Sequence, residues 1–100
     1  MNILILGGGG REHALAWAVS QNPKCDKLIV APGNAGIAQV ATCAALSAED
    51  PSAVVQFAEA EAIDLVIIGP EAPLAAGVGD RLREAGFPVF GPNQAAARLE

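Results

Sequence analysis

Four consecutive glycines, at positions 7–10, join a mostly apolar run at 2–6 to a segment with helical character at 11–21. The apolar run predicts a strand that is buried on both faces, as in parallel sheets covered by helices. At the start of a helix the backbone N–H groups are unpaired and lie at the positive end of the helix dipole. This junction therefore predicts an α/β domain whose first loop holds a phosphate group.

The rest of the chain continues the alternation of strands and helices. Expected strands are 2–6, 28–31, 39–43, 65–68 and 88–90, and expected helices are 11–21, one that begins at Asp50–Pro51, and 77–85. Strands that alternate with helices need crossover connections, which favours a doubly wound parallel sheet, Rossmann-like, in three α/β/α layers. The 100 residues suit one domain, and a helix-forming run at 94–100 without a stop signal suggests a chain cut from something longer.

Composition defines what the core is made of. The chain is 52% apolar with only four aromatic residues, so Ala, Val, Ile and Leu must fill the core. The first helix is expected to bury Ala14, Leu15, Ala18 and Val19, and the second Val54, Val55, Ala58 and Ala62. Trp17 is interpreted as a packing residue or part of a domain interface rather than a platform for base stacking.

Charge and cysteine usage exclude several classes of function. The net charge of -5, with no basic run, argues against nucleic acid as a partner. The apolar stretches are far shorter than the roughly 20 residues that span a bilayer, so no membrane partner is expected. Cys25 and Cys43 lack metal-ligand spacing and His13 is the only histidine, so we expect reduced thiols, a cytoplasmic protein and no metal site.

Glycine is concentrated where a ligand should bind. Under the expected element order, ten of the eleven glycines lie near the carboxyl edge of the sheet, with Gly86 the exception. Ligands of open parallel sheets bind at that edge. Gly8, Gly9 and Gly10 are the candidate backbone donors to a phosphate, and Arg11 would add a charged forked donor.

Two other phosphate-binding patterns fit less well. A dinucleotide site would follow Gly7 and Gly9 with glycine or alanine at position 12, where this chain has Glu12, and would need an acidic residue near Ala31–Pro32. The Walker pattern fails because no Lys-Ser or Lys-Thr follows the glycines. An oxidoreductase domain that binds NAD or flavin, and a phosphate-sensing or scaffold module, remain alternatives.

Four segments together resemble the phosphoribosylamine–glycine ligase family, also called glycinamide ribonucleotide synthetase: 7–14, 31–36, 64–74 and 90–92. The similarity covers essentially the whole chain. It implies the N-terminal, pre-ATP-grasp domain of a purine-biosynthesis ligase of the ATP-grasp superfamily, inactive alone. In that family ATP phosphorylates the carboxylate of glycine, and the amine of 5-phosphoribosylamine attacks the acyl phosphate to give glycinamide ribonucleotide. ATP and Mg2+ would bind outside this chain, on the missing ATP-grasp domains.

The resemblance also suggests roles for single residues. Gly8, Gly9, Gly10 and Arg11 would hold the substrate 5-phosphate; many relatives have serine in place of Gly8, which leaves the backbone donor intact. Glu71 would accept hydrogen bonds from ribose hydroxyls or the reacting amine, and Asn34 would help close the site. No residue is assigned proton transfer or metal binding. Structural alternatives are a left-handed turn for Asn34, an exposed loop charge for Glu71, and a helix-start role for Glu12 and His13.

Overall fold

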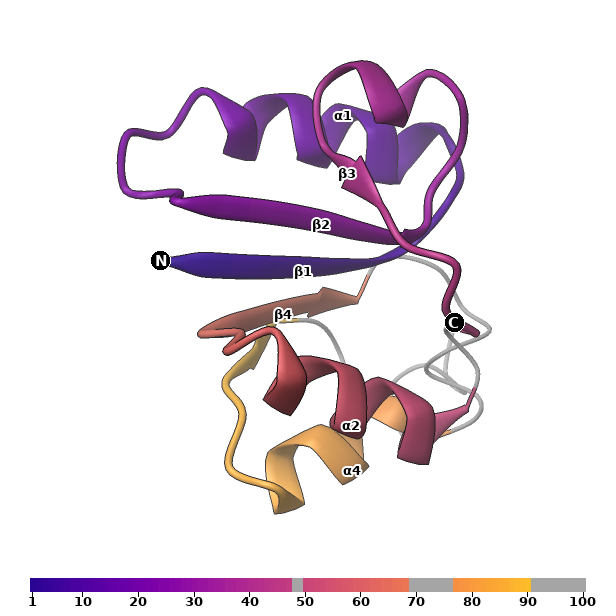
Figure 1. Ribbon diagram of the computed structural model, residues 1–100, viewed down its shortest axis with the longest axis vertical. Coiled ribbons are helices and arrows are strands. Elements are labelled where there is room, and N and C mark those ends of the chain that lie inside the picture. Colours follow the sequence, from indigo (N-terminus) through magenta and orange to yellow (C-terminus); the bar gives the residue numbers. More distant parts are fainter. Residues whose placement is uncertain (48–49, 69–76, 91–100) are drawn as a thin grey trace, which may run out of the picture.

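The computed structural model describes residues 1–47, 50–68 and 77–90, and within them the chain forms one parallel sheet flanked by helices (Figure 1). The sheet has the order β3-β2-β1-β4-β5, with every neighbouring pair parallel. Its strands are β1 Asn2–Gly7, β2 Lys27–Pro32, β3 Thr42–Cys43, β4 Leu65–Ile68 and β5 Val89–Phe90. The helices are α1 Gly10–Ser20, α2 Pro51–Ala60 and α4 Val78–Glu84, with a short 3-10 helix η1 at Ile37–Gln39. The predicted doubly wound, Rossmann-like fold is confirmed.

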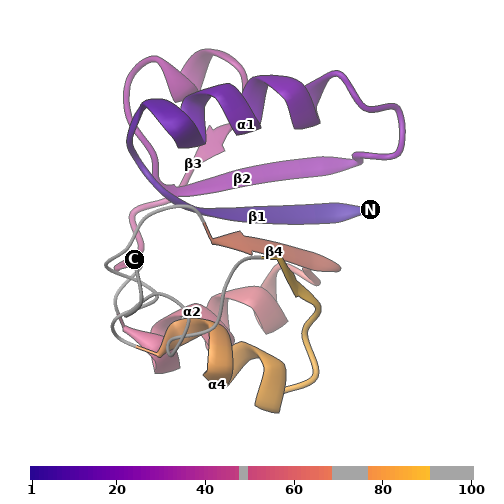
Figure 2. The same ribbon diagram turned by 180° about the vertical axis from the view of Figure 1, so that it is seen from behind.

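The helices cover both faces of the sheet. Figures 1 and 2 show α1 and η1 on one face and α2 and α4 on the other. Successive residues of β1 point to opposite faces, so Leu4 and Leu6 pack with α2 and α4 while Ile3 and Ile5 pack with α1 and η1. This alternation gives two hydrophobic clusters and confirms the three predicted layers.

Local signals in the sequence set the ends of two helices as expected. Asp50 precedes α2, and its Oδ1 accepts a hydrogen bond of 3.2 Å from the backbone N–H of Ala53. Pro51 takes the first helical position, where its missing N–H costs nothing. Gly86, with φ of +92°, follows α4 and supplies the left-handed conformation that commonly ends a helix.

Three details of the predicted elements are wrong. The strand expected at 39–43 shortens to Thr42–Cys43 because η1 takes residues 37–39. On α1, Ala14 and Ala18 are exposed, and the buried residues are Glu12 and Ala16. Ala62 lies beyond the end of α2, exposed and with φ of +53°, and so does not extend the buried face.

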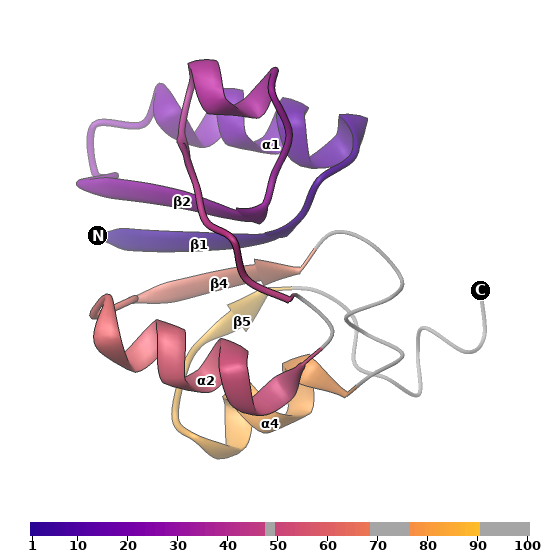
Figure 3. The ribbon, with the colours of Figure 1, turned by 45° about the vertical axis from the view of Figure 1, so that its right-hand side comes forward.

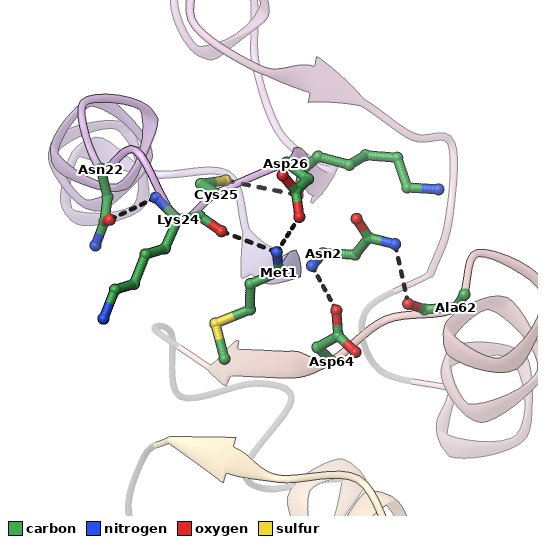
Figure 4. Close-up of polar contacts among 9 residues, drawn as sticks. Met1, Asn2, Asn22, Lys24, Cys25, Asp26, Ala62 and Asp64 are labelled. Carbon is green, nitrogen blue, oxygen red and sulfur yellow. Dashed lines mark hydrogen bonds and ion pairs between the residues drawn. The ribbon is translucent and has the colours of Figure 1, made fainter.

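The first two residues of the chain, Met1 and Asn2, make polar contacts at the amino edge of the sheet (Figure 4). The Met1 ammonium donates to the Asp26 carboxylate and to the carbonyl of Lys24, and the hydrogen bond to Asp26 raises the pKa of this amine above its ordinary value. Asn2 donates from its backbone to Asp64, over 2.7 Å, and from its side chain to the carbonyl of Ala62. These contacts tie the loops that precede β2 and β4 to the start of β1.

Several predictions fall on residues whose structure is not described. These are the Gly69–Leu74 segment with Glu71, the Phe90–Pro92 segment beyond Phe90, and the helix expected at 94–100. Among the helices that are described, none combines the length and the apolar character needed to cross a membrane.

Candidate phosphate-binding loop

The glycine loop between β1 and α1 lies at the carboxyl edge of the sheet, and the strands end on this same side (Figure 3). Gly7 has φ of +139°, a conformation that side chains rarely adopt. A Cβ atom on Gly7 would fall 2.5 Å from the Cγ of Glu12, and one on Gly8 would fall 2.7 Å from the carbonyl oxygen of Gly33. Two of the four glycines are therefore needed for local packing, whatever the loop binds.

Three backbone donors at the start of α1 are available to a ligand. The first hydrogen bond of the helix runs from His13 N–H to the carbonyl of Gly9, over 3.1 Å. Within the described residues no group accepts from the N–H of Gly10, Arg11 or Glu12. Gly10 and Arg11 are exposed, so these donors lie at a solvent-facing helix start where the dipole favours an anion.

The fourth donor of this group, the amide of Gly9, is already engaged. It donates to Oε1 of Glu12 over 2.9 Å, and Glu12 is only 4% exposed. The helix-start interpretation of Glu12 is thus confirmed, because the carboxylate of the first turn satisfies the residue just before the helix. Gly9 itself is exposed. If Gly9 takes part in binding, it does so by letting the ligand come close to the backbone, because its amide already donates to Glu12.

Asn34 connects the loop after β2 to the glycine loop. Its Nδ2 donates to the carbonyl of Gly8 over 2.6 Å, and its Oδ1 accepts from the backbone N–H of Ile37 over 2.9 Å. Gly33 N–H also donates to the carbonyl of Gly7, over 3.0 Å. The two loops are therefore joined by backbone and side-chain hydrogen bonds, and both polar groups of the Asn34 side chain are used.

The left-handed turn expected at Asn34 belongs instead to its neighbour. Gly33 has φ of +72°, whereas Asn34 does not have a positive φ. A Cβ atom on Gly33 would lie 2.4 Å from Sγ of Cys43, so a side chain would not fit there. The turn alternative for Asn34 is wrong, because the conformation and the lack of space both require glycine one residue earlier.

His13 makes a further contact, between α1 and the loop after β2. A Cβ atom on Gly36 would lie 3.0 Å from Cε1 of His13, which places the imidazole ring against the Gly36 backbone. His13 is only partly buried and belongs to the second turn of α1. Its position is that of a packing residue at the helix start. Sequence reasoning missed this contact, because the pairing of the loops depends on the tertiary fold.

Of the other candidate groups, Cys43 lies beside the loop after β2, where its Sγ donates to the carbonyl of Asn34 over 3.6 Å. Trp17 is 57% exposed on α1, which excludes it from the core. Cys25 and Cys43 are free thiols, and burial raises the pKa of Cys25. No three His, Cys, Asp or Glu side chains come together as a metal site in the part of the chain that the structure describes.

The fold and this loop define a class of protein: a Rossmann-like α/β domain with a glycine-rich loop at the start of its first helix. A Glu in place of the third glycine or alanine of the dinucleotide pattern separates the chain from typical dinucleotide-binding members of that class. The chain belongs to the family of the phosphoribosylglycinamide synthetase N domain, whose model matches residues 1–100.

The relatives that the chain matches are named phosphoribosylamine–glycine ligases. The chain is 58% identical over its whole length to phosphoribosylamine–glycine ligase of Agrobacterium fabrum and 58% identical to that of Haemophilus influenzae. It spans 24% of the length of each, about a quarter of those ligases. It therefore corresponds to one domain of the enzymes it matches.

Solved structures agree with this assignment. The crystal structure of phosphoribosylamine–glycine ligase from Thermotoga maritima superposes with a TM-score of 0.66 at 28% identity, over all of this chain and 22% of that one. A transformylase from Mycobacterium tuberculosis, described as glycinamide-RNase-transformylase T, superposes with a TM-score of 0.72 over 98% of this chain and 30% of that one. At 17% identity, the second likeness shows a common fold alone.

Proposed function

We propose that this chain is the substrate-holding N-terminal domain of a phosphoribosylamine–glycine ligase, and that its glycine loop binds the 5-phosphate of phosphoribosylamine. The observation that carries the proposal is the group of three N–H donors at the start of α1, on Gly10, Arg11 and Glu12, which have no acceptor among the described residues. Membership of the family supports the assignment to a ligase. The unpaired N–H donors support the binding of a phosphate.

The loop suits a phosphate monoester on physical grounds. Several N–H groups that converge at the positive end of a helix dipole stabilise a dianion. A Cβ atom on Gly10 would have nothing within 4 Å, so the loop is open beside this residue. Arg11 is exposed beside these donors and can add a charge-assisted hydrogen bond. Asn34 and Gly33 would act by holding the loop in this shape rather than by contacting the phosphate.

In the proposed reaction the domain binds and orients one substrate. ATP and Mg2+ supply the activation of the glycine carboxylate as an acyl phosphate, on the longer polypeptide. No step through either group is assigned to the described residues. Holding phosphoribosylamine by its phosphate would aim the amine at the acyl phosphate, and such positioning is a large part of catalysis between two substrates. Glu71 stays a proposed contact to the ribose or amine.

A proline substitution tests the backbone donors one at a time. Gly10 is the first helical residue, where proline is well tolerated, and Gly9 before it is extended at φ −95° and ψ −172°. Gly10→Pro therefore removes one N–H and keeps the helix, while Gly10→Ala keeps the N–H as a matched control. In the intact ligase we expect Gly10→Pro to raise KM for phosphoribosylamine about tenfold, as for the loss of one hydrogen bond to a charged group.

The control variants make the outcome specific. Gly10→Ala should stay within about threefold of the parent, because it adds a methyl group in open space, and KM for glycine and ATP should change little in both variants. Equal KM for phosphoribosylamine in Gly10→Pro and the parent would contradict the proposed phosphate site. A rise of all three KM values together would instead indicate a general loss of structure.

A further inference from the structure

Glu12 is the one buried charged side chain among the described residues, and the proposed binding of a phosphate does not require it. The side chain lies directly under the glycine loop. A Cβ on Gly7 would be 2.5 Å from its Cγ and Oε1, and a Cβ on Gly9 would be 3.3 Å from the same Oε1. A helix-start acid usually stays in solvent, so the burial of this one against two glycines calls for a reason.

We infer that Glu12 is a specificity-determining residue, which limits the loop to a single phosphate group and excludes ligands with a diphosphate bridge, such as dinucleotides. The inference rests on the proposed function, because it assumes that a phosphate occupies the free donors of α1. It goes further in naming the feature that selects a phosphate monoester.

Glu12 excludes a diphosphate in part by its size. In dinucleotide-binding loops the second glycine lets the backbone approach the pyrophosphate, and the third lets helix and strand pack closely. In this chain Gly9 takes the second position and Glu12 the third. Glu12 fills the space between the helix and Gly7 that a glycine or alanine would leave empty. The Glu12 side chain therefore prevents the close packing of helix and strand that a pyrophosphate-binding loop requires.

Glu12 also excludes a second phosphate by its charge. The Gly9 amide, which would face a pyrophosphate, is turned to the Glu12 carboxylate instead, over 2.9 Å. A second phosphate that reached toward Gly9 would find the donor occupied and a negative charge beside it. Like charges at such a separation repel strongly where water is partly excluded. One phosphate on the remaining donors of Gly10, Arg11 and Glu12 avoids that position.

Two inhibitors and two variants test this in the intact ligase. Ribose 5-phosphate represents the monoester and ADP-ribose the diphosphate, and each is measured for competition with phosphoribosylamine at saturating ATP, so that binding at an ATP site does not count. We expect the parent to be inhibited by ribose 5-phosphate and at least about tenfold more weakly by ADP-ribose, a discrimination that steric exclusion can supply. Glu12→Ala should then improve inhibition by ADP-ribose about tenfold or more.

Glu12→Gln is the matched control. It keeps the size of the side chain and an oxygen that accepts from Gly9 while it removes the charge, so its gain in ADP-ribose inhibition should be smaller than that of Glu12→Ala. A merely structural role would raise KM for phosphoribosylamine in Glu12→Ala without any gain for ADP-ribose.

Two results would overturn the inference: equal inhibition of the parent by both compounds, or a folded Glu12→Ala variant without the gain. An equal gain in Glu12→Gln would support it and assign the exclusion to the charge of Glu12. If Glu12→Ala does not fold, the test uses Glu12→Ser as a second small replacement, together with the comparison of ribose 5-phosphate and ADP-ribose as inhibitors of the parent. The proposed function has a separate readout. Failure of ribose 5-phosphate to compete in the parent would reject the phosphate site itself, whatever ADP-ribose does.

Discussion

Replacing Asn34 by alanine should loosen the contact between the two loops at the carboxyl edge. The substitution removes the donor to the carbonyl of Gly8, at 2.6 Å, and the acceptor for Ile37 N–H, at 2.9 Å. A hydrogen bond contributes about 1 kcal/mol net, and the more exposed Gly8 bond falls at the lower end of that range. We therefore expect Asn34→Ala to lower the free energy of unfolding by about 1.5 kcal/mol, which corresponds to a Tm lower by roughly 6–12 °C in a domain of this size.

Asn34→Asp separates the two hydrogen bonds. Aspartate keeps an oxygen that accepts from Ile37 N–H but places its second oxygen opposite the Gly8 carbonyl, so the variant should lose at least about 0.5–1 kcal/mol. Urea unfolding followed by far-UV circular dichroism measures both variants against the parent chain. If both stay within about 0.5 kcal/mol of the parent, as ordinary surface substitutions do, the side chain of Asn34 does not hold the loops together.

Three further substitutions probe the same structure by unfolding measurements. Gly8→Ala should cost about 1–3 kcal/mol, because the new Cβ would lie 2.7 Å from the carbonyl oxygen of Gly33; a stable variant would show that this backbone can shift freely. Asp50→Ala should cost about 1 kcal/mol through loss of the cap of α2, and an unchanged stability would refute the cap. Trp17→Ala should change the stability of the isolated chain by less than about 0.5 kcal/mol, since the side chain is 57% exposed; a larger loss would place it in the core.

The sequence predicts the fold well where one strong signal acts alone. The apolar run at 65–68 and the Asp50–Pro51 pair each identify an element, and both lie as expected. Prediction failed where a tertiary contact decides. Glu12 takes the buried place on α1 because Gly9 offers it a hydrogen bond, and small alanines on the same helix can remain in solvent at little cost.

For the site, too, the sequence predicts local features and misses those that depend on tertiary contacts. The position of the glycine loop follows from local sequence, because a strand, four glycines and a helix leave unpaired donors at the junction. The engagement of the Gly9 amide and the bridge from Asn34 to Gly8 do not follow, since each depends on a pairing that only the folded chain creates. A short signal was present all the same: an acid three residues after Gly9 has the spacing of a capping box.

Amide NMR of the intact ligase, with this domain labelled with 15N, shows whether a phosphate binds at the start of α1. On titration with ribose 5-phosphate, the backbone amides of Gly10, Arg11 and Glu12 should show the largest shifts, because they are the free donors at the start of α1. The amide of Gly9 should shift less, since it already donates to Glu12. Saturating shifts confined to other parts of the chain, with these three amides unmoved, would contradict a phosphate site at this helix start.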